Sequence, residues 1–134
     1  MVDVRTIRLI LELRESGISD SKVLSAIEQI PREIFVPKPF KNQAYENIAL
    51  PIEDQQTISQ PLVVALMTVA LELNKTNKVL EIGTGSGNLA ITIAMENIAK
   101  NIIATDISKK KIDIAKYNKK RLSPDSKIKF RRPR

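Results

Sequence analysis

The sequence predicts an α/β fold preceded by a helical region, on the basis of three observations. From residue 78 onward, short apolar runs alternate with stretches of helical spacing. A glycine-rich loop, Gly83 to Gly87, separates the first run from the next helical stretch. Asp106 ends the second run, 19 residues beyond Gly87. Alternating strands and helices indicate a parallel sheet. We therefore divide the chain into residues 1–77, with helices and a loop, and residues 78–134, the start of the α/β domain.

The first region opens with two expected helices. Apolar residues at helical spacing predict a helix over residues 4–15, and Gly17 is suited to end it. Asp20 can cap a second helix, which must end before Pro31. Pro31 can itself open one further turn, since proline suits the first helical position.

The rest of the first region is expected to be a loop, an extended segment and one long helix. Pro37 and Pro39 predict a loop, and residues 48–60 read as extended or irregular. Pro61 opens a helix over residues 61–73. Its expected buried stripe is Leu62, Val63, Leu66, Val69, Ala70 and Leu73.

The second region alternates strands and helices. Strands are expected over residues 79–82 and 102–106, and a third begins at 127–130. Helices are expected over residues 89–99 and 107–121. The apolar side of the last helix is Ile112, Ala115 and Leu122.

The composition excludes several chemistries. The 134 residues contain no Cys and no His, which removes a thiolate nucleophile, an imidazole base and a Cys/His metal cluster. No apolar run is long enough to span a bilayer, so we expect a cytoplasmic protein without membrane or metal partners.

The net charge of +7 is unevenly distributed. Residues 109–134 carry 12 Lys or Arg against Asp113 and Asp125. A nucleic-acid-binding segment is one interpretation. We favour a solvated helix face, because Tyr117 and Phe130 are the only aromatic residues there that could stack on bases.

The glycine loop and the acidic residues near it indicate a cofactor site. Gly83, Gly85 and Gly87 alternate, unlike the dinucleotide fingerprint, and resemble the loop of Rossmann-like S-adenosylmethionine-dependent methyltransferases. A carboxylate placed like Asp106 accepts hydrogen bonds from ribose hydroxyls in such folds, although a helix N-cap is its alternative role. Glu81, just before the loop, can bond loop amides or the cofactor.

Four separated motifs resemble one family in its order, between about Val4 and Phe130. They are Leu13-Arg14-Glu15-Ser16-Gly17-Ile18-Ser19-Asp20, Pro31-Arg32-Glu33-Ile34-Phe35-Val36-Pro37, Ala49-Leu50-Pro51-Ile52 and Gln56-Thr57-Ile58-Ser59-Gln60-Pro61. These segments resemble those of protein-L-isoaspartate O-methyltransferases. The resemblance implies transfer of a methyl group from S-adenosylmethionine to the free carboxylate of isoaspartyl residues in damaged proteins, as a repair reaction. It also implies that the complete protein is a monomer.

The resemblance also implies roles for individual residues. Thr57, Ile58, Ser59 and Gln60 correspond to the family's substrate-facing segment, called the substrate loop below. Ser59 is the expected catalytic-site residue, although from local sequence alone it could simply cap the helix opened by Pro61. The expected cofactor-binding residues are Glu81, Gly83, Thr84, Gly85, Gly87 and Asp106.

The chain departs from the family pattern at three places. Gln55 replaces a usual Gly, and Asn88 replaces a usual Tyr. After Phe130 the family's further motif and strands are replaced by a basic ending. We therefore expect the first strand to lie at an open sheet edge. We also expect residues 1–134 alone to be partly folded and nearly inactive, which leaves a non-catalytic remnant as the alternative function.

Overall fold

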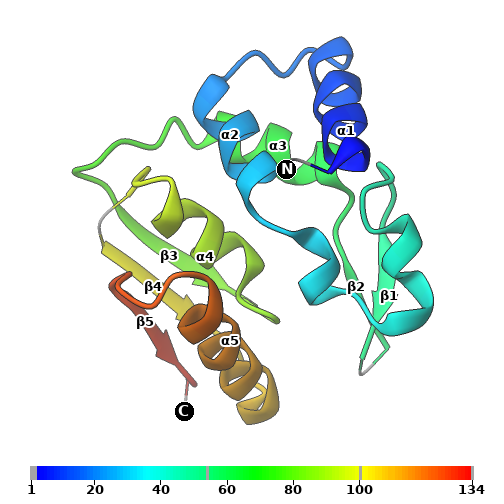
Figure 1. Cartoon of the computed structure of the whole chain (residues 1–134). Helices are drawn as coiled ribbons and strands as arrows, with labels where there is room; N and C mark the ends of the chain where they lie inside the picture. Colours follow the sequence, from blue (N-terminus) through cyan, green and yellow to red (C-terminus); the bar gives the residue numbers. More distant parts are fainter. Residues whose placement is uncertain (1–2, 54, 100, 134) are drawn as a thin grey trace. The chain divides into compact units, whose positions relative to one another are not determined.

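Figure 1 shows the computed structural model of the chain, which describes residues 3–53, 55–99 and 101–133. The chain forms two compact units, Met1–Glu72 and Leu73–Arg134. Each unit has its own set of elements and is described by itself.

The first unit begins with two helices, each capped at its N-terminus by an aspartate, of which only Asp20 was expected. They are α1 (Val4–Glu15) and α2 (Ser21–Gln29). Asp3 caps α1, and the Asp20 carboxylate accepts hydrogen bonds from two main-chain N–H groups of α2. Gly17, with φ +94°, follows α1 in the left-handed conformation that commonly ends a helix. Leu9 and Leu13 of α1 are buried.

Two 3₁₀ helices follow, η1 (Arg32–Phe35) and η2 (Lys38–Gln43). The turn expected at Pro31 is therefore present, with Pro31 just before it. The loop expected at Pro37 and Pro39 is wrong, because these residues flank the first position of η2. A fixed proline φ near −65° suits the first turn of a helix as well as a loop.

The segment expected to be extended forms a small antiparallel hairpin. Its strands are β1 (Leu50–Ile52) and β2 (Gln56–Ile58), with Leu50 paired to Ile58. Gln55 lies directly before β2 and has φ +54°, a conformation that strongly favours glycine. The position where the family usually has Gly is therefore one where the backbone is left-handed.

Helix α3 (Pro61–Ala70) is three residues shorter than expected, and its buried side is different. Its buried residues are Pro61, Ala65 and Thr68, whereas Val63 and Leu66 of the expected stripe are 42% and 50% exposed. The expected stripe is wrong because a helix that is apolar on most sides carries no clear periodic signal. Here small side chains make the close contacts.

The second unit is a three-stranded parallel sheet covered by two helices. The strands are β3 (Lys78–Ile82), β4 (Asn101–Thr105) and β5 (Ile128–Arg131), in the order β3-β4-β5. The helices are α4 (Asn88–Met95) and α5 (Lys109–Leu122). Figure 1 shows both helices on the same side of the sheet. Right-handed crossovers between successive neighbouring strands place their helices on one face.

The core of this unit lies between α4 and the sheet. It is built from small and branched aliphatic residues: Ala90, Ile93, Ile98, Ala99, Ile102 and Ala104. Val79, Ile128 and Phe130 pack against it from the outer strands. Helix α4 ends at Met95, earlier than the expected residue 99, but Ile98 and Ala99 still reach the core through a turn.

The opposite face of β3 is open in the described part of the chain. Leu80 and Ile82 alternate with core-facing residues along the strand and are 63% and 83% exposed. Strand β3 is also an edge strand, as expected. Apolar residues on a parallel strand are typical of sheets that are covered on both faces.

Candidate functional site

The glycine loop is held against the carboxyl end of β4 by main-chain hydrogen bonds. The N–H groups of Gly83 and Thr84 both donate to the carbonyl of Thr105, each at 2.8 Å. Gly83 and Gly85 have φ of +75° and +55°, and a Cβ atom added to either would meet no atom within 4 Å. The loop therefore has a left-handed backbone at two glycines, which adopt it without steric cost, and open space above it, where another molecule could approach closely.

Asp106 organises this loop from the end of β4. It is 7% exposed, and its Oδ2 atom accepts a hydrogen bond from Gly85 N at 3.0 Å. Its Oδ1 atom accepts from Ser108 N at 2.9 Å. Asp106 is not the N-cap of α5: that residue is Ser108, whose hydroxyl accepts from Lys111 N. Each carboxylate oxygen retains a second lone pair for a further donor.

Glu81 is the second carboxylate at the loop. Its Oε2 atom accepts a hydrogen bond from the Thr84 hydroxyl at 2.7 Å. The pKa of Glu81 is raised to about 7, mainly by burial and in smaller part by the negative charge of Asp106. Hydrogen bonds from Thr84 and from the Ala90 amide act in the opposite direction. A positive charge at the loop would favour the ionised form of Glu81.

Gly87 has a packing role. It is the N-cap of α4, with φ +82° and no side-chain cap. A Cβ atom there would lie 3.0 Å from the Cβ of Ala115 on α5 and 3.3 Å from Ile91. Gly87 thus permits the close approach of α4 and α5.

Sequence reasoning missed Asn118, which also supports the loop. Asn118 is 5% exposed on α5, and its Nδ2 atom donates to the carbonyl of Ser86 at 2.9 Å. The available signal was a polar residue three positions after Ala115, on the buried side of the helix. Buried amides of this kind need a hydrogen-bond partner, and the loop provides one.

The substrate loop lies in the first unit. Ile58 is buried and anchors it, whereas Thr57 and Ser59 are exposed. Gln60, not Ser59, is the N-cap of α3, so the capping alternative for Ser59 is wrong. Among the described residues, no hydrogen bond involves the Ser59 hydroxyl. A substrate group could therefore use it as donor or acceptor.

Two side chains from earlier segments hold the substrate loop, and sequence reasoning assigned a role to neither. Arg32 donates to the carbonyl of Ser59 at 2.9 Å. The side-chain Oδ1 atom of Asn47 accepts a hydrogen bond from Leu62 N at 2.9 Å. The main-chain carbonyl of Asn47 accepts one from Gln60 Nε2 at 2.8 Å. Asn47 thereby supplies the cap that α3 lacks locally.

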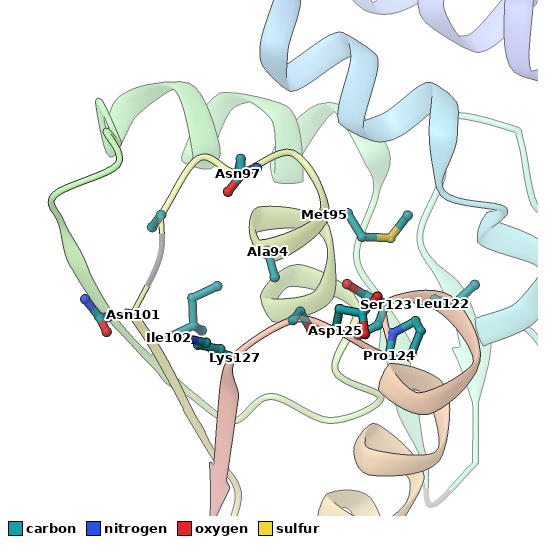
Figure 2. Close-up of a pocket in the computed structure, with 12 residues that line it drawn as sticks. Ala94, Met95, Asn97, Asn101, Ile102, Leu122, Ser123, Pro124, Asp125 and Lys127 are labelled. Atoms are coloured by element: carbon teal, nitrogen blue, oxygen red, sulfur yellow. Dashed lines mark hydrogen bonds between the residues drawn. The ribbon is translucent and has the colours of Figure 1, made fainter.

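A separate pocket of about 760 Å³ lies at the amino ends of β4 and β5 (Figure 2). Asn101 lines it from the start of β4 and Lys127 from the residue before β5, and Met95 and Leu122 line it from the ends of α4 and α5. Ligands of open α/β sheets bind at the carboxyl ends of the strands, where the glycine loop lies. This pocket is at the opposite end, so we assign it no part in the site.

Two other kinds of feature are absent from the described residues. No group of three or more Asp and Glu side chains there is placed to hold a metal ion. No helix in the same part of the chain combines the length and apolar character needed to cross a membrane.

Comparison with known proteins gives consistent results. The profile of the protein-L-isoaspartate(D-aspartate) O-methyltransferase family matches residues 5–131. The protein-L-isoaspartate O-methyltransferase of Rhodospirillum rubrum is 62% identical over 93 residues, 69% of this chain and 42% of that protein. That of Sodalis glossinidius is 47% identical over 110 residues, 82% of this chain and 52% of that protein.

Two solved structures are similar in fold to this chain. One protein-L-isoaspartate O-methyltransferase superposes with a TM-score of 0.80 at 32% identity, covering 95% of this chain and 41% of that one. A putative member from Plasmodium falciparum, in complex with S-adenosyl-L-homocysteine, has a TM-score of 0.76 at 22% identity, over 94% and 62% of the two chains.

The match covers nearly all of this chain but only part of each relative. The chain spans about half or less of the length of the curated relatives described above, while the family profile covers nearly all of this chain. The separated sequence motifs, the Rossmann-like sheet and the glycine loop all fit one assignment. The chain belongs to the protein-L-isoaspartate(D-aspartate) O-methyltransferase family.

Proposed function

We propose that the protein transfers a methyl group from S-adenosylmethionine to the free carboxylate of isoaspartyl residues in damaged proteins. One observation supports this most: Glu81 and Asp106 both bond the open glycine loop at the carboxyl end of the sheet. Family membership supplies the reaction class. The substrates, damaged proteins and peptides, and the repair role are part of the proposal.

The residues present fit S-adenosylmethionine. The open space above Gly83 and Gly85 allows close approach of a ligand to the backbone. The two carboxylates complement a ligand that carries positive charge on its amino and sulfonium groups. In our proposal Asp106 accepts hydrogen bonds from the ribose hydroxyls, and Glu81, Gly83, Thr84 and Gly85 border the methionine end. Gly87 contributes through helix packing.

The methyl acceptor needs no general base. A carboxyl group with an ordinary pKa of about 4 is ionised at neutral pH, which suits a chain with no His and no Cys. When bound, the cofactor supplies a methyl group activated by sulfonium. The substrate carboxylate would receive this methyl group, and the carbon–sulfur electron pair would remain on sulfur. The protein's contribution is to align these atoms and exclude water.

Ser59 is the proposed catalytic residue. Its exposed hydroxyl can donate a hydrogen bond to the non-attacking oxygen of the isoaspartyl carboxylate, which orients the attacking oxygen. Thr57, Ile58 and Gln60 shape the loop around it. Because the substrate loop belongs to the first unit, removal of the Ser59 hydroxyl should leave the glycine loop in the second unit intact.

The test is methyl transfer by purified residues 1–134 to an isoaspartyl peptide, with the matching aspartyl peptide as control. Ser59→Ala should lower turnover by about ten- to a hundred-fold, the loss expected for a hydrogen bond to a charged group. The dissociation constant of S-adenosylmethionine should stay the same. Equal losses of cofactor affinity and turnover would contradict the role of Ser59.

A non-catalytic remnant is the second candidate. The observation that favours it is the open face of the edge strand β3, where Leu80 and Ile82 are exposed. Cofactor binding without turnover in the same assay would favour this candidate. The cytoplasmic location and the monomeric state stay predictions.

A further inference from the structure

Arg32 connects three separate segments of the first unit. Its guanidinium donates from Nη1 to the carbonyl of Ala44 at 2.7 Å, and from Nη2 to the carbonyls of Ile48 and Ser59 at 3.1 and 2.9 Å. These carbonyls lie 12, 16 and 27 residues further along the chain. One side chain thus bonds the end of η2, the approach to β1 and the substrate loop.

The position of Arg32 is itself well anchored. The residue begins η1, directly after Pro31, whose ring restricts the backbone. Phe35 and Val36, at the other end of η1, are 7% and 4% exposed. The guanidinium therefore extends from a turn with a restricted backbone and a buried end to the carbonyl of Ser59.

Burial of this charge is energetically costly and calls for an explanation. Arg32 is 8% exposed, and in the described part of the chain its hydrogen-bond partners are all main-chain carbonyls. Burial lowers the pKa of Arg32 to about 10, so it remains positively charged at neutral pH. A buried arginine normally pairs with a carboxylate. Here the charge is directed at the backbone instead.

We propose that Arg32 is a positioning residue for methyl transfer: it holds the Ser59 carbonyl, and with it the substrate loop, in the reactive arrangement. The inference rests on the proposed function of that loop. The planar guanidinium offers five N–H groups in a fixed fork, which suits three carbonyls approaching from different directions. A lysine ammonium keeps the charge but cannot reproduce this geometry.

Positioning matters for this reaction because the enzyme supplies little besides alignment. The carboxylate oxygen, the methyl carbon and the sulfur must lie in line, and a displacement of about 1 Å can cost on the order of 10²-fold in rate. Ser59 follows the short strand β2 and precedes α3. Without Arg32, the loop would keep its support from Asn47 but lose the contact at Ser59 itself.

The experiment compares Arg32→Met, Arg32→Lys and a control, Tyr45→Phe, in residues 1–134. Tyr45 donates a hydrogen bond to the Glu33 carboxylate, so the control removes a partly buried hydrogen bond nearby without touching the substrate loop. For each variant we would measure kcat and KM with an isoaspartyl peptide, per folded molecule. We would also measure the dissociation constant of S-adenosylmethionine and hydrogen exchange of the loop amides.

The expected result separates positioning from stability. Arg32→Met should lower kcat by on the order of 10²-fold, with unchanged cofactor affinity and faster exchange at the amides of Ser59, Gln60 and Leu62. Arg32→Lys should lie closer to Arg32→Met than to wild type. If Arg32→Met does not fold, Arg32→Lys decides the question by the same readouts. Tyr45→Phe should keep wild-type kcat and loop exchange even if it melts earlier.

Two results would overturn the proposal. One is normal kcat per folded molecule with unchanged loop exchange in both Arg32 variants. The other is an equal loss of kcat and equal loop exchange in Tyr45→Phe. If wild type shows no methyl transfer, the proposed function of this chain fails separately. Hydrogen exchange in the Arg32 variants then tests whether Arg32 holds the substrate loop. Faster exchange confined to the loop amides supports this role, and unchanged exchange refutes it.

Discussion

The glycine loop and the substrate loop are held in different ways. The glycine loop is bonded by groups from the strand, turn and helix that follow it: the Thr105 carbonyl, the Asp106 carboxylate and the Asn118 amide. The substrate loop is bonded by Arg32 and Asn47, which precede it in segments with no regular strand or long helix. One loop depends on a repeating strand–helix pattern, the other on individual long-range contacts.

This difference predicts which property each substitution changes. A change at the glycine loop should alter cofactor affinity and the stability of the second unit. A change at the supports of the substrate loop should alter peptide turnover and the stability of the first unit. The following four changes test that separation, in order of expected effect.

The largest effect is expected from the pH dependence of Glu81. Its pKa is raised from 4.5 to about 7 in the folded protein, so the folded protein holds a proton that the unfolded chain releases in this range. The stability from this group is full below pH 4.5 and is lost as pH rises through about 7. Between these limits wild type loses this stability, whereas Glu81→Gln has no group to titrate there. The unfolding free energy of Glu81→Gln minus that of wild type should therefore increase by about 3 kcal/mol.

Thermal and denaturant unfolding across pH 4 to 8 would measure this difference, with Glu15→Gln on the exposed end of α1 as control. A difference that does not vary with pH would show that Glu81 titrates normally. Because S-adenosylmethionine is cationic, wild-type affinity for it should also increase as pH rises through about 7.

The next effect is expected from Asp106→Ala, which removes the acceptor for Gly85 N and Ser108 N. If Asp106 also accepts from the ribose, cofactor affinity should fall about ten- to a hundred-fold, since such a bond contributes roughly 1.5–3 kcal/mol. Calorimetry would measure it. Asp113→Ala, an exposed carboxylate on α5, removes the same charge and should have little effect. Equal losses in both variants would point to net charge alone.

Asn47→Ala tests the supports of the substrate loop. It removes the acceptor for Leu62 N and should destabilise the first unit by about 0.5–2 kcal/mol, the usual cost of losing a helix cap. Chemical denaturation would measure this loss. Asn42→Ala, at an exposed position of η2, is the matched control. Reduced cofactor affinity in Asn47→Ala would contradict the separation between the two loops.

The smallest effect is expected at the hairpin turn. Gln55 has φ +54°, so Gln55→Gly should relieve backbone strain and stabilise the first unit by about 0.5–1 kcal/mol. Gln56→Gly, in β2, should instead destabilise it, because glycine weakens a strand. Both changes would be followed by thermal unfolding. Destabilisation by both would mean that Gln55 makes contacts more important than its strain.

Much of the fold could be predicted because local sequence decides it. Asp20 caps α2, and the strand–loop–helix order around Gly83 is as expected, since capping and periodicity act over a few residues. The buried side of α3 could not be predicted. Val63 and Leu66 are apolar yet exposed, and only the neighbouring elements determine which side of an apolar helix is buried.

The candidate site divides in the same way. The sequence by itself determined the family, the glycine loop, Asp106 as its acidic partner, and the absence of His and Cys that excludes several reaction types. Only the tertiary structure decided that Asp106 bonds Gly85, that Asn118 supports Ser86, and that Arg32 reaches Ser59. The physical reason is distance along the chain. These hydrogen bonds join residues 21 to 32 positions apart, and folding brings such partners together without leaving a local pattern.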